Sequence, residues 1–186
     1  DSDDYIPAEY FERLYRAAVE VDADVAMCGI VKQKPYGERV VVAFQQSEIA
    51  TDATAKMRLC HCPPEFHPVN KLYRREMIER LGLRFREGVQ YEDVMFVSRA
   101  IVECQRLVTV PGVAYRYVLN PNSTGKSRQT AAKQLQKYNA HRAMVDYMTE
   151  RGIRLSSRHT NITVRHESLF GLCLWKIKER GRYDKV

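Results

Sequence analysis

Two adjacent carboxylates, Glu92 and Asp93, stand where a run of turn-forming residues gives way to an apolar segment beginning near Val94. Acidic side chains favour the first turn of a helix, because they interact with the helix dipole and with unpaired backbone N–H groups. Helix capping therefore explains the pair without any catalytic role. The alternative is a carboxylate that takes a proton from a nucleophile, and this depends on the other polar segments of the chain.

Two further polar segments accompany this pair: residues 1–4 (DSDD) and residues 70–76 (NKLYRRE). Carboxylate oxygens are the ligands that hard divalent cations such as Mg²⁺ prefer. One acidic cluster can therefore hold a cation while the other supplies a free carboxylate as a base. This division of roles predicts group transfer from a phosphate-bearing donor.

Four segments follow one another in the order 1–7 (DSDDYIP), 70–76 (NKLYRRE), 81–85 (LGLRF) and 91–94 (YEDV). In this order they resemble the second half of a family 2 glycosyltransferase with the GT-A fold, and the resemblance covers residues 1–124. It implies an α/β fold, namely a partial GT-A domain (Rossmann-like, of the nucleotide-diphospho-sugar transferase type) followed by a helical C-terminal tail. Residues 1–125 would form the second half of the catalytic domain, and residues 126–186 a basic, mainly helical extension.

The resemblance also implies a role for each matching residue. Asp93 would be the general base that deprotonates an acceptor hydroxyl, and Glu92 would support it. Asp3 would hold a Mg²⁺ or Mn²⁺ ion, with Asp1 contacting the metal or the donor. For Arg74 a solvated surface cation is an equally good interpretation. The diphosphate of the donor would lie near three basic residues, Lys71, Arg74 and Arg116.

The sequence departs from the family pattern after residues 114–117 (AYRY). Members of the family often carry His or Arg two or three residues beyond these tyrosines, whereas this chain has Val118 and Leu119. Arg116 is the candidate replacement. The third protein ligand of the metal is therefore not identified by the sequence.

The activity implied is transfer of a sugar from a nucleotide-diphosphate donor, foremost a UDP-sugar, to a hydroxyl of a carbohydrate or lipid-linked acceptor. Transfer would invert the anomeric carbon, require the metal and serve cell-surface polysaccharide synthesis. Because the sequence begins inside the acidic motif, we expect residues 1–186 alone to lack part of the donor site and to be inactive. The alternative is a non-catalytic binding or scaffold domain, in which the acids are helix caps and the basic tail docks to an anionic surface.

The elements that must position these residues follow from the hydrophobic pattern. Apolar residues at helical spacing predict helices over residues 7–21, 47–57 (capped by Ser47), 75–81 (ended by Gly82), 94–104 and 130–151. Short apolar runs predict strands over residues 25–31, 39–44, 69–73, 107–110 and 113–119, the last two divided by Pro111 and Gly112. With no strand ahead of residue 1, the strand at 25–31 is expected to expose one edge, which predicts a homodimer by edge pairing.

Size and composition narrow the class of protein. The sequence has 186 residues, of which 45% are apolar, enough for one sizeable core. No apolar run is long enough to span a bilayer. Five cysteines at irregular spacing argue against a disulfide framework and favour a reducing compartment. We therefore expect a cytoplasmic protein, at the inner face of the membrane if it binds lipid.

The charge is unevenly distributed. The formal net charge is +7, with 14 Lys and Arg against 5 acids in residues 126–186, so the tail carries +9 and the remainder −2. Such a tail favours an acidic partner or peripheral contact with an anionic membrane, and no nucleic-acid-binding motif is present. Apolar residues within 168–178 allow three interpretations: a membrane interface, core packing or a dimer contact.

Two further motifs are discounted. Residues 60–68 (CHCPPEFHP) contain four metal-ligand side chains, but this spacing cannot easily wrap one tetrahedral zinc ion. A loop stiffened by prolines is the better interpretation, in which His67 is either structural or in contact with substrate. Residues 125–127 (GKS) imitate the end of a phosphate-binding loop, but Asn120 stands where that loop requires glycine.

Overall fold

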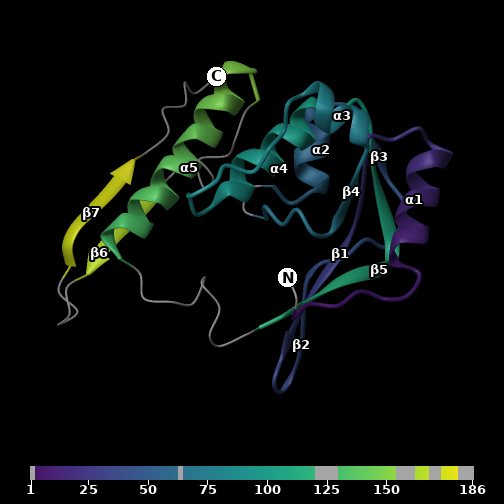
Figure 1. Cartoon of the computed structure of the whole chain (residues 1–186), viewed down its shortest axis with the longest axis horizontal. Helices are drawn as coiled ribbons and strands as arrows, with labels where there is room; N and C mark the ends of the chain where they lie inside the picture. The colour runs from purple at the N-terminus through teal and green to yellow at the C-terminus, as the bar shows by residue number, and fades with distance from the viewer. Residues whose placement is uncertain (1–2, 63–64, 120–129, 154–161, 168–172, 180–186) are drawn as a thin grey trace. The chain divides into compact units, whose positions relative to one another are not determined.

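The computed structural model describes residues 3–62, 65–119 and 130–153 in full, and residues 162–167 and 173–179 as backbone (Figure 1). The chain divides into two compact units. Unit 1 comprises residues 1–83 and 99–127, and unit 2 comprises residues 84–98 and 128–186.

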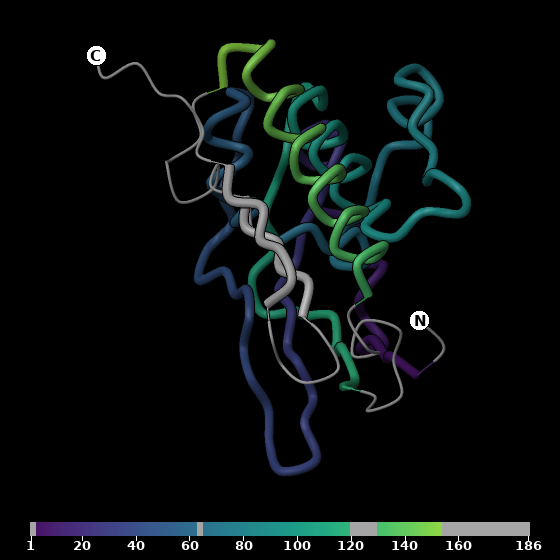
Figure 2. The backbone as a smooth tube through the Cα atoms, turned by 90° about the vertical axis from the view of Figure 1, so that its left-hand side faces the viewer, coloured from purple at the N-terminus to yellow at the C-terminus, as the bar shows by residue number. Residues whose placement is uncertain are grey.

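A five-stranded mixed sheet forms the centre of unit 1. Its central strand, β1 (Val25–Lys34), runs parallel to β5 (Leu107–Val118) on one side. On its other side β1 pairs antiparallel with β4 (Lys71–Tyr73) near its start and with β2 (Gly37–Val42) near its end. The short strand β3 (Ile49–Ala50) pairs with the beginning of β5. Figure 2 shows the β1–β2 hairpin as the blue loop that extends beyond the other strands of unit 1.

The predicted exposed edge at residues 25–31 is therefore wrong. Residues 25–27 of β1 pair with β4, and residues 30–34 pair with β2. Between them, the backbone N–H of Cys28 donates to the carbonyl of Asn70 at 2.9 Å, and the Asn70 side-chain amide donates to the carbonyl of Cys28 at 2.7 Å. Segments that come later in the chain fold back to satisfy this edge, so a homodimer through β1 has no structural basis.

The helix α1 (Tyr10–Glu20) covers one face of the sheet (Figure 1). Its bounds are close to the predicted ones, residues 7–21. Tyr10 and Leu14, one helical turn apart, are buried against β1 and β5 in an apolar cluster. The Tyr10 hydroxyl donates to the carbonyl of Val69 at 2.6 Å. The cluster also includes Ala23, Ala26, Cys28, Val108, Val110, Val113 and Tyr115.

Residues 107–118 form one strand with a bulge, and not the two strands that were predicted over 107–110 and 113–119. The pairing of β1 with β5 shifts register between Cys28 and Gly29, which lie opposite Val110 and Ala114. Within the bulge Gly112 has φ +68°, a conformation that glycine adopts without steric cost. The guanidinium of Arg13 on α1 donates to the carbonyls of Pro111 and Gly112 at 2.6 and 3.0 Å. The Arg13 side chain thus provides hydrogen bonds to carbonyl groups of the bulge, where the regular pairing of β1 with β5 is interrupted.

The remaining helices of unit 1 flank the strands. The side chain of Asp52 caps α2, accepting from the backbone of Ala55 at 2.9 Å, so the predicted cap at Ser47 is wrong. The chain around Ser47 leads into β3 instead. Gly82 follows α3 with φ +57°, as its predicted role as a helix stop requires. The bounds are Ala53–Leu59 for α2, Arg75–Arg80 for α3 and Glu92–Glu103 for α4, of which residues 99–103 belong to unit 1.

Unit 2 contains the C-terminal extension. The predicted helix is present as α5 (Ala131–Glu150), where the side chain of Thr130 accepts from the backbone of Lys133 at 3.3 Å. After it, β6 (Ile162–Glu167) and β7 (Cys173–Glu179) pair antiparallel, an element that was not predicted. Residues 168–172 lie outside the described part of the chain. Among the described residues, no helix is long and apolar enough to cross a membrane.

We predict that Gly29→Ala destabilises unit 1. A Cβ atom at this position would lie 2.8 Å from the carbonyl oxygen of Val42 and 3.3 Å from the Cβ of Ala114. Because backbone is less able to move than a flexible side chain, the expected loss in free energy of unfolding is about 1–3 kcal/mol. Urea unfolding of wild type and variant measures it. An unchanged midpoint would show that β2 can withdraw from β1 without cost.

Candidate functional site

The acidic turn at residues 3–5 is fastened to the end of β5. The carboxylate of Asp4 accepts from the Tyr115 hydroxyl at 2.8 Å and from the backbone N–H of Val118 at 2.7 Å. Tyr5 and Arg116 exchange two backbone hydrogen bonds of 3.2 and 3.0 Å. Because β1 and β5 are parallel, this turn lies at the carboxyl ends of both strands. Open α/β sheets bind their ligands at such ends.

Asp3 is the exposed carboxylate of this turn, whereas Asp1 lies outside the described residues. Burial raises the pKa of Tyr115, and its hydrogen bond to Asp4 and the negative charges of Asp4 and Asp3 raise it further. The Tyr115 hydroxyl therefore remains protonated and acts as a donor. The contributions of Asp4 and Asp3 reflect their negative charge at the turn, and such charge also attracts a cation.

The carboxylate oxygens of the turn are ligands that suit a hard divalent cation. Among the described residues, no group of three His, Cys, Asp or Glu side chains could hold a metal. Mg²⁺ does not require such a cage, since it is commonly bound through one or two carboxylates together with substrate phosphates and water. Asp3 fits that kind of ligand. Neither a third protein ligand nor a zinc site at residues 60–67 is found in the described part of the chain.

Arg116 lies at the same end of the sheet as the acidic turn. Its guanidinium pairs with the Glu38 carboxylate of β2 at 2.8 Å. The side chain is about one third exposed (30%). The structure therefore places Asp3 and Arg116, two of the predicted site residues, at the same end of the sheet.

Lys71 is buried, and its ammonium group is hydrogen-bonded internally. It donates to the carbonyl of His67 at 2.6 Å and to the Asn70 side chain at 2.8 Å. Burial lowers the pKa of Lys71. In this structure Lys71 holds the loop that leads into β4, and its contact with a diphosphate stays a prediction.

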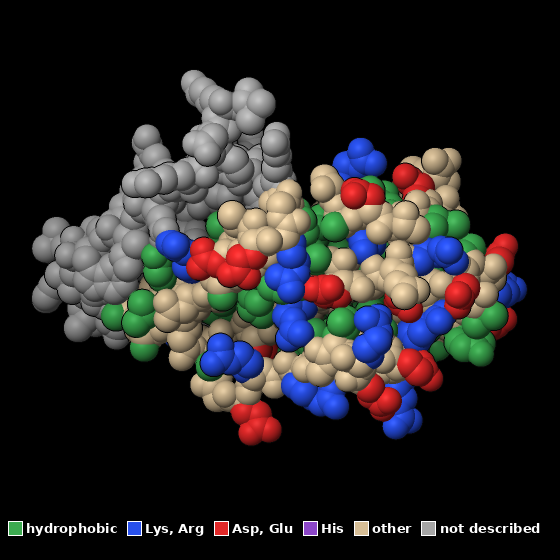
Figure 3. All heavy atoms as spheres, turned by 90° about the horizontal axis from the view of Figure 1, so that it is seen from above, with side chains coloured by type: hydrophobic (Ala, Val, Ile, Leu, Met, Phe, Trp, Pro, Cys, Tyr) green, Lys and Arg blue, Asp and Glu red, His purple; other side chains and the backbone are tan. Residues whose placement is uncertain are grey.

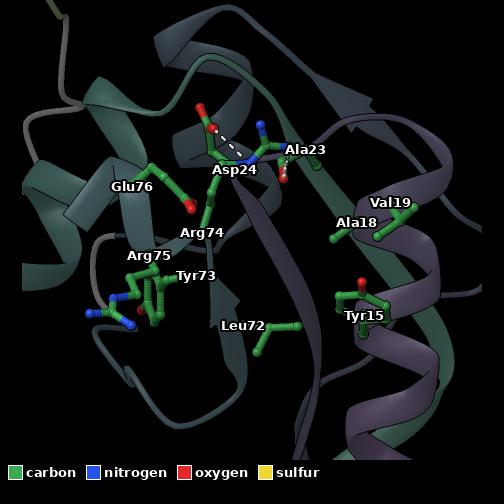
Figure 4. Close-up of a pocket in the computed structure, with 10 residues that line it drawn as sticks. All are labelled: Tyr15, Ala18, Val19, Ala23, Asp24, Leu72, Tyr73, Arg74, Arg75 and Glu76. Carbon is green, nitrogen blue, oxygen red and sulfur yellow. Dashed lines mark hydrogen bonds and ion pairs between the residues drawn. The ribbon is translucent and has the colours of Figure 1, made fainter. Parts of the chain in front are cut away.

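Arg74 lies at the opposite end of the sheet from Asp3. Its guanidinium contacts the Asp22 carboxylate at 2.5 Å. It also contacts the Asp24 carboxylate at 3.5 Å (Figure 4). This network adjoins the first residue of β1, whereas Asp4 is bound to Val118 at the far end of β5. The eight residue steps along β1 between these places span roughly 26 Å. A single donor site containing both Asp3 and Arg74 does not agree with this separation.

A pocket of 260 Å³ lies beside Arg74, between α1 and β4 (Figure 4). Tyr15, Ala18 and Val19 of α1 form one wall, and Leu72 faces them. The pocket is at the amino ends of β1 and β5, away from the end where open α/β sheets bind ligands. Its position gives no support to the predicted donor site.

The environment of His67 includes residues that the sequence did not single out. His67 pairs with Glu65 at 3.1 Å, and its ring lies 6.0 Å from that of Tyr117, over which Lys32 is placed at 5.6 Å. Burial lowers the pKa of His67 and Lys32 lowers it further, while Glu65 opposes both. Tyr117 stands two residues after Tyr115 and therefore lies on the same face of β5. This spacing of the two tyrosines was the sequence signal that could have singled out Tyr117. Contact of His67 with substrate stays a prediction.

In unit 2, Asp93 stands in the first turn of α4 with a raised pKa. Burial is the larger cause and the charge of Glu92 the second, while hydrogen bonds from the backbone N–H groups of Val94 and Asp93 oppose them. A simple helix cap would lower the pKa of a carboxyl. The pKa rises because desolvation outweighs the backbone hydrogen bonds, and the role of Asp93 as a base stays a prediction.

The loop before Asp93 is held in an uncommon backbone conformation. Tyr91 has φ +63°, a left-handed value that costs energy for a residue with a Cβ, and Gly88 has φ +72°. The backbone N–H of Gln90 donates to the Gln136 side chain of α5 at 2.9 Å. Such strain persists only where surrounding contacts impose it, and it commonly marks functional loops.

The described surface shows no single basic patch on the face seen in Figure 3. Lys and Arg side chains lie there among Asp and Glu side chains. Much of the predicted basic tail falls outside the residues whose side chains are described. Its binding to an anionic surface therefore stays a prediction.

Comparison with known proteins gives one sequence relative. No protein-family model matches the chain. Over 128 residues it is 30% identical to the uncharacterized glycosyltransferase EpsJ of Bacillus subtilis (strain 168). The match covers 66% of this chain and 37% of the relative, so the chain spans little more than a third of that protein's length.

The fold is similar to solved structures of TarS from S. aureus. TarS residues 1–349 in complex with UDP-GlcNAc match with a TM-score of 0.64 and 20% identity, over 80% of this chain and 41% of that one. The complex of the same TarS residues with UDP matches with a TM-score of 0.59, over 80% and 39% of the two chains. The predicted α/β fold is thereby confirmed. In sequence the chain is similar to part of a glycosyltransferase, and in fold to part of TarS residues 1–349.

Proposed function

We propose that the protein is a glycosyltransferase that moves a sugar from a nucleotide-diphosphate donor to an acceptor hydroxyl. The observation that carries this proposal is the position of Asp93 in the first turn of α4, two residues after the strained backbone of Tyr91. Burial at this position raises the pKa of the Asp93 carboxyl. A carboxylate whose pKa is moved toward neutrality is a stronger base, as proton removal from a hydroxyl requires. The similarity to EpsJ and the TarS fold support the same activity.

In the proposed reaction Asp93 accepts the proton of the acceptor hydroxyl. The hydroxyl oxygen then forms a bond to the anomeric carbon as the bond from that carbon to the diphosphate oxygen breaks. Attack from the face opposite the leaving group inverts the anomeric centre. Glu92 supports the base, because its negative charge helps to keep the pKa of Asp93 high.

Asp3 is the proposed carboxylate ligand of Mg²⁺ or Mn²⁺, with Asp1 in the same motif. The bound ion would neutralise the charge that develops on the departing diphosphate. Arg116 is the proposed second source of positive charge at this end of unit 1. To contact the diphosphate it would give up part of its pairing with Glu38.

A UDP-sugar is the proposed donor, because the TarS structures that share this fold hold UDP-GlcNAc and UDP. A carbohydrate or lipid-linked acceptor, a part in polysaccharide synthesis and a cytoplasmic location at the inner membrane face stay predictions. Calorimetry of the full-length protein with UDP-sugars and Mn²⁺, followed by detection of the transferred sugar, tests the proposal. A scaffold domain would bind no UDP-sugar, and that result would contradict it.

We predict that Asp93→Asn lowers kcat about 10²-fold or more while the KM for the donor stays unchanged, since only proton removal is lost. Steady-state kinetics of the full-length enzyme measure both constants. Glu92→Gln is the matched control, because it removes the adjacent charge and keeps the base. Equal turnover in Asp93→Asn and wild type would remove Asp93 from the mechanism.

The pH dependence of kcat provides a separate prediction. Because the pKa of Asp93 is raised from its ordinary value of 3.8, the base is protonated, and activity lost, at a higher pH than for a free aspartate. The acidic limb of the profile should therefore lie above pH 3.8. In Glu92→Gln one cause of the rise is removed, so the limb should move to lower pH. A wild-type acidic limb at or below pH 3.8 would assign it to another group.

We also predict that the two arginines at opposite ends of the sheet differ in function. Arg74→Ala should lower the thermal midpoint, because Asp22 and Asp24 lose their partner, and leave the KM for the UDP-sugar within about twofold of wild type. Arg116→Ala should raise that KM. Kinetics and thermal unfolding of both variants decide between these roles, and a raised KM in Arg74→Ala would restore Arg74 to the donor site.

A further inference from the structure

We infer that Asp4 and Tyr115 form a positioning pair for Asp3, and that Asp4 is not itself a metal ligand. The sequence indicates Asp3 as the metal ligand and assigns no role to its neighbour Asp4. The structure shows that the Asp4 side chain is bound to β5. The inference rests on the proposed function, in which Asp3 binds the cation that accompanies the donor.

Both carboxylate oxygens of Asp4 are already engaged by β5. Oδ2 accepts from the Tyr115 hydroxyl at 2.8 Å, and Oδ1 accepts from the backbone N–H of Val118 at 2.7 Å. Hydrogen bonds to an ionised acceptor are short and strong compared with neutral ones. Asp4 is therefore held at two points on a strand of the central sheet.

Moving Asp4 toward a cation would leave Tyr115 without this acceptor. Tyr115 is only 8% exposed and packs in the apolar cluster beneath α1, with its ring 6.4 Å from that of Tyr10. Because this hydrogen bond is partly shielded from solvent, its loss costs free energy. The geometry thus favours Asp4 remaining where it is.

The backbone on the C-terminal side of Asp3 is fixed by the same strand. Asp4 is bound through its side chain, and Tyr5 exchanges two backbone hydrogen bonds with Arg116. Together these bonds tie two consecutive residues after Asp3 to residues 115–118. Because outer groups orient metal ligands and their loss commonly costs 10–100-fold in affinity, the pair sets where the Asp3 carboxylate is presented.

The test compares Mn²⁺ affinity in the full-length protein. Tyr115→Phe removes one oxygen and keeps the packed ring, and the apparent Kd for Mn²⁺ should rise about tenfold, as for loss of an outer group. Asp4→Asn should raise it by a similar factor. The double variant should show little more than either single change, since both break one interaction. Paramagnetic resonance of free Mn²⁺, with UDP present at saturation, reports binding without relying on turnover.

Tyr10→Phe is the matched control. It removes a hydroxyl from the same cluster, where Tyr10 donates to the Val69 carbonyl at 2.6 Å, and this residue makes no contact with Asp4 in the hydrogen bonds described. The variant should lower the thermal midpoint and leave Mn²⁺ affinity unchanged. A general effect of lost stability on metal binding would appear in this control as well.

Distinct outcomes would overturn the inference. Wild-type Mn²⁺ affinity in Tyr115→Phe would show that the pair does not position Asp3. A much larger loss in Asp4→Asn than in Tyr115→Phe, with additive effects, would make Asp4 a ligand. Both results leave the proposed function standing. If the wild-type protein bound neither Mn²⁺ nor any UDP-sugar, the proposed function itself would fail, and the inference with it.

Discussion

The parallel pairing of β1 with β5 is the constraint on which the rest of unit 1 depends. It joins residues 25–33 to residues 107–118 and brings the carboxyl ends of both strands to one edge. The bulge at Gly112 shifts the register of the second half of β5, and so decides which of its residues meet the acidic turn. Arg13 stabilises that bulge from α1, which couples the packing of the helix to the position of the turn.

The two ends of this sheet differ in the use of their charges. At the amino ends, Arg74 is paired with Asp22 and Asp24, so these charges hold the turn before β1. At the carboxyl ends, Asp3 is exposed to solvent. Arg116 is partly exposed there and is paired with the Glu38 carboxylate. The proposed function places the donor at the carboxyl ends, where open α/β sheets bind their ligands.

The sequence by itself determined the elements that depend on local patterns. Helix α1 follows from apolar residues at helical spacing, and Gly82 ends α3 as its left-handed backbone requires. The apolar run of β1 predicted a strand with both faces buried. The order of the four short motifs also carried the resemblance to glycosyltransferases. These features need only neighbours in the chain, and neighbours are visible in the sequence.

Only the tertiary structure decided which distant groups meet. The second edge of β1 is covered by β2 and β4, Arg74 lies far from Asp3, and Lys71 is buried beneath its own loop. Asp4 and Tyr115 are 111 residues apart in the chain, and their hydrogen bond exists because a bulge sets the register of β5. Strand order and register depend on the packing of the whole sheet against α1. A sequence pattern with a period of two or three to four residues carries no information about such long-range contacts.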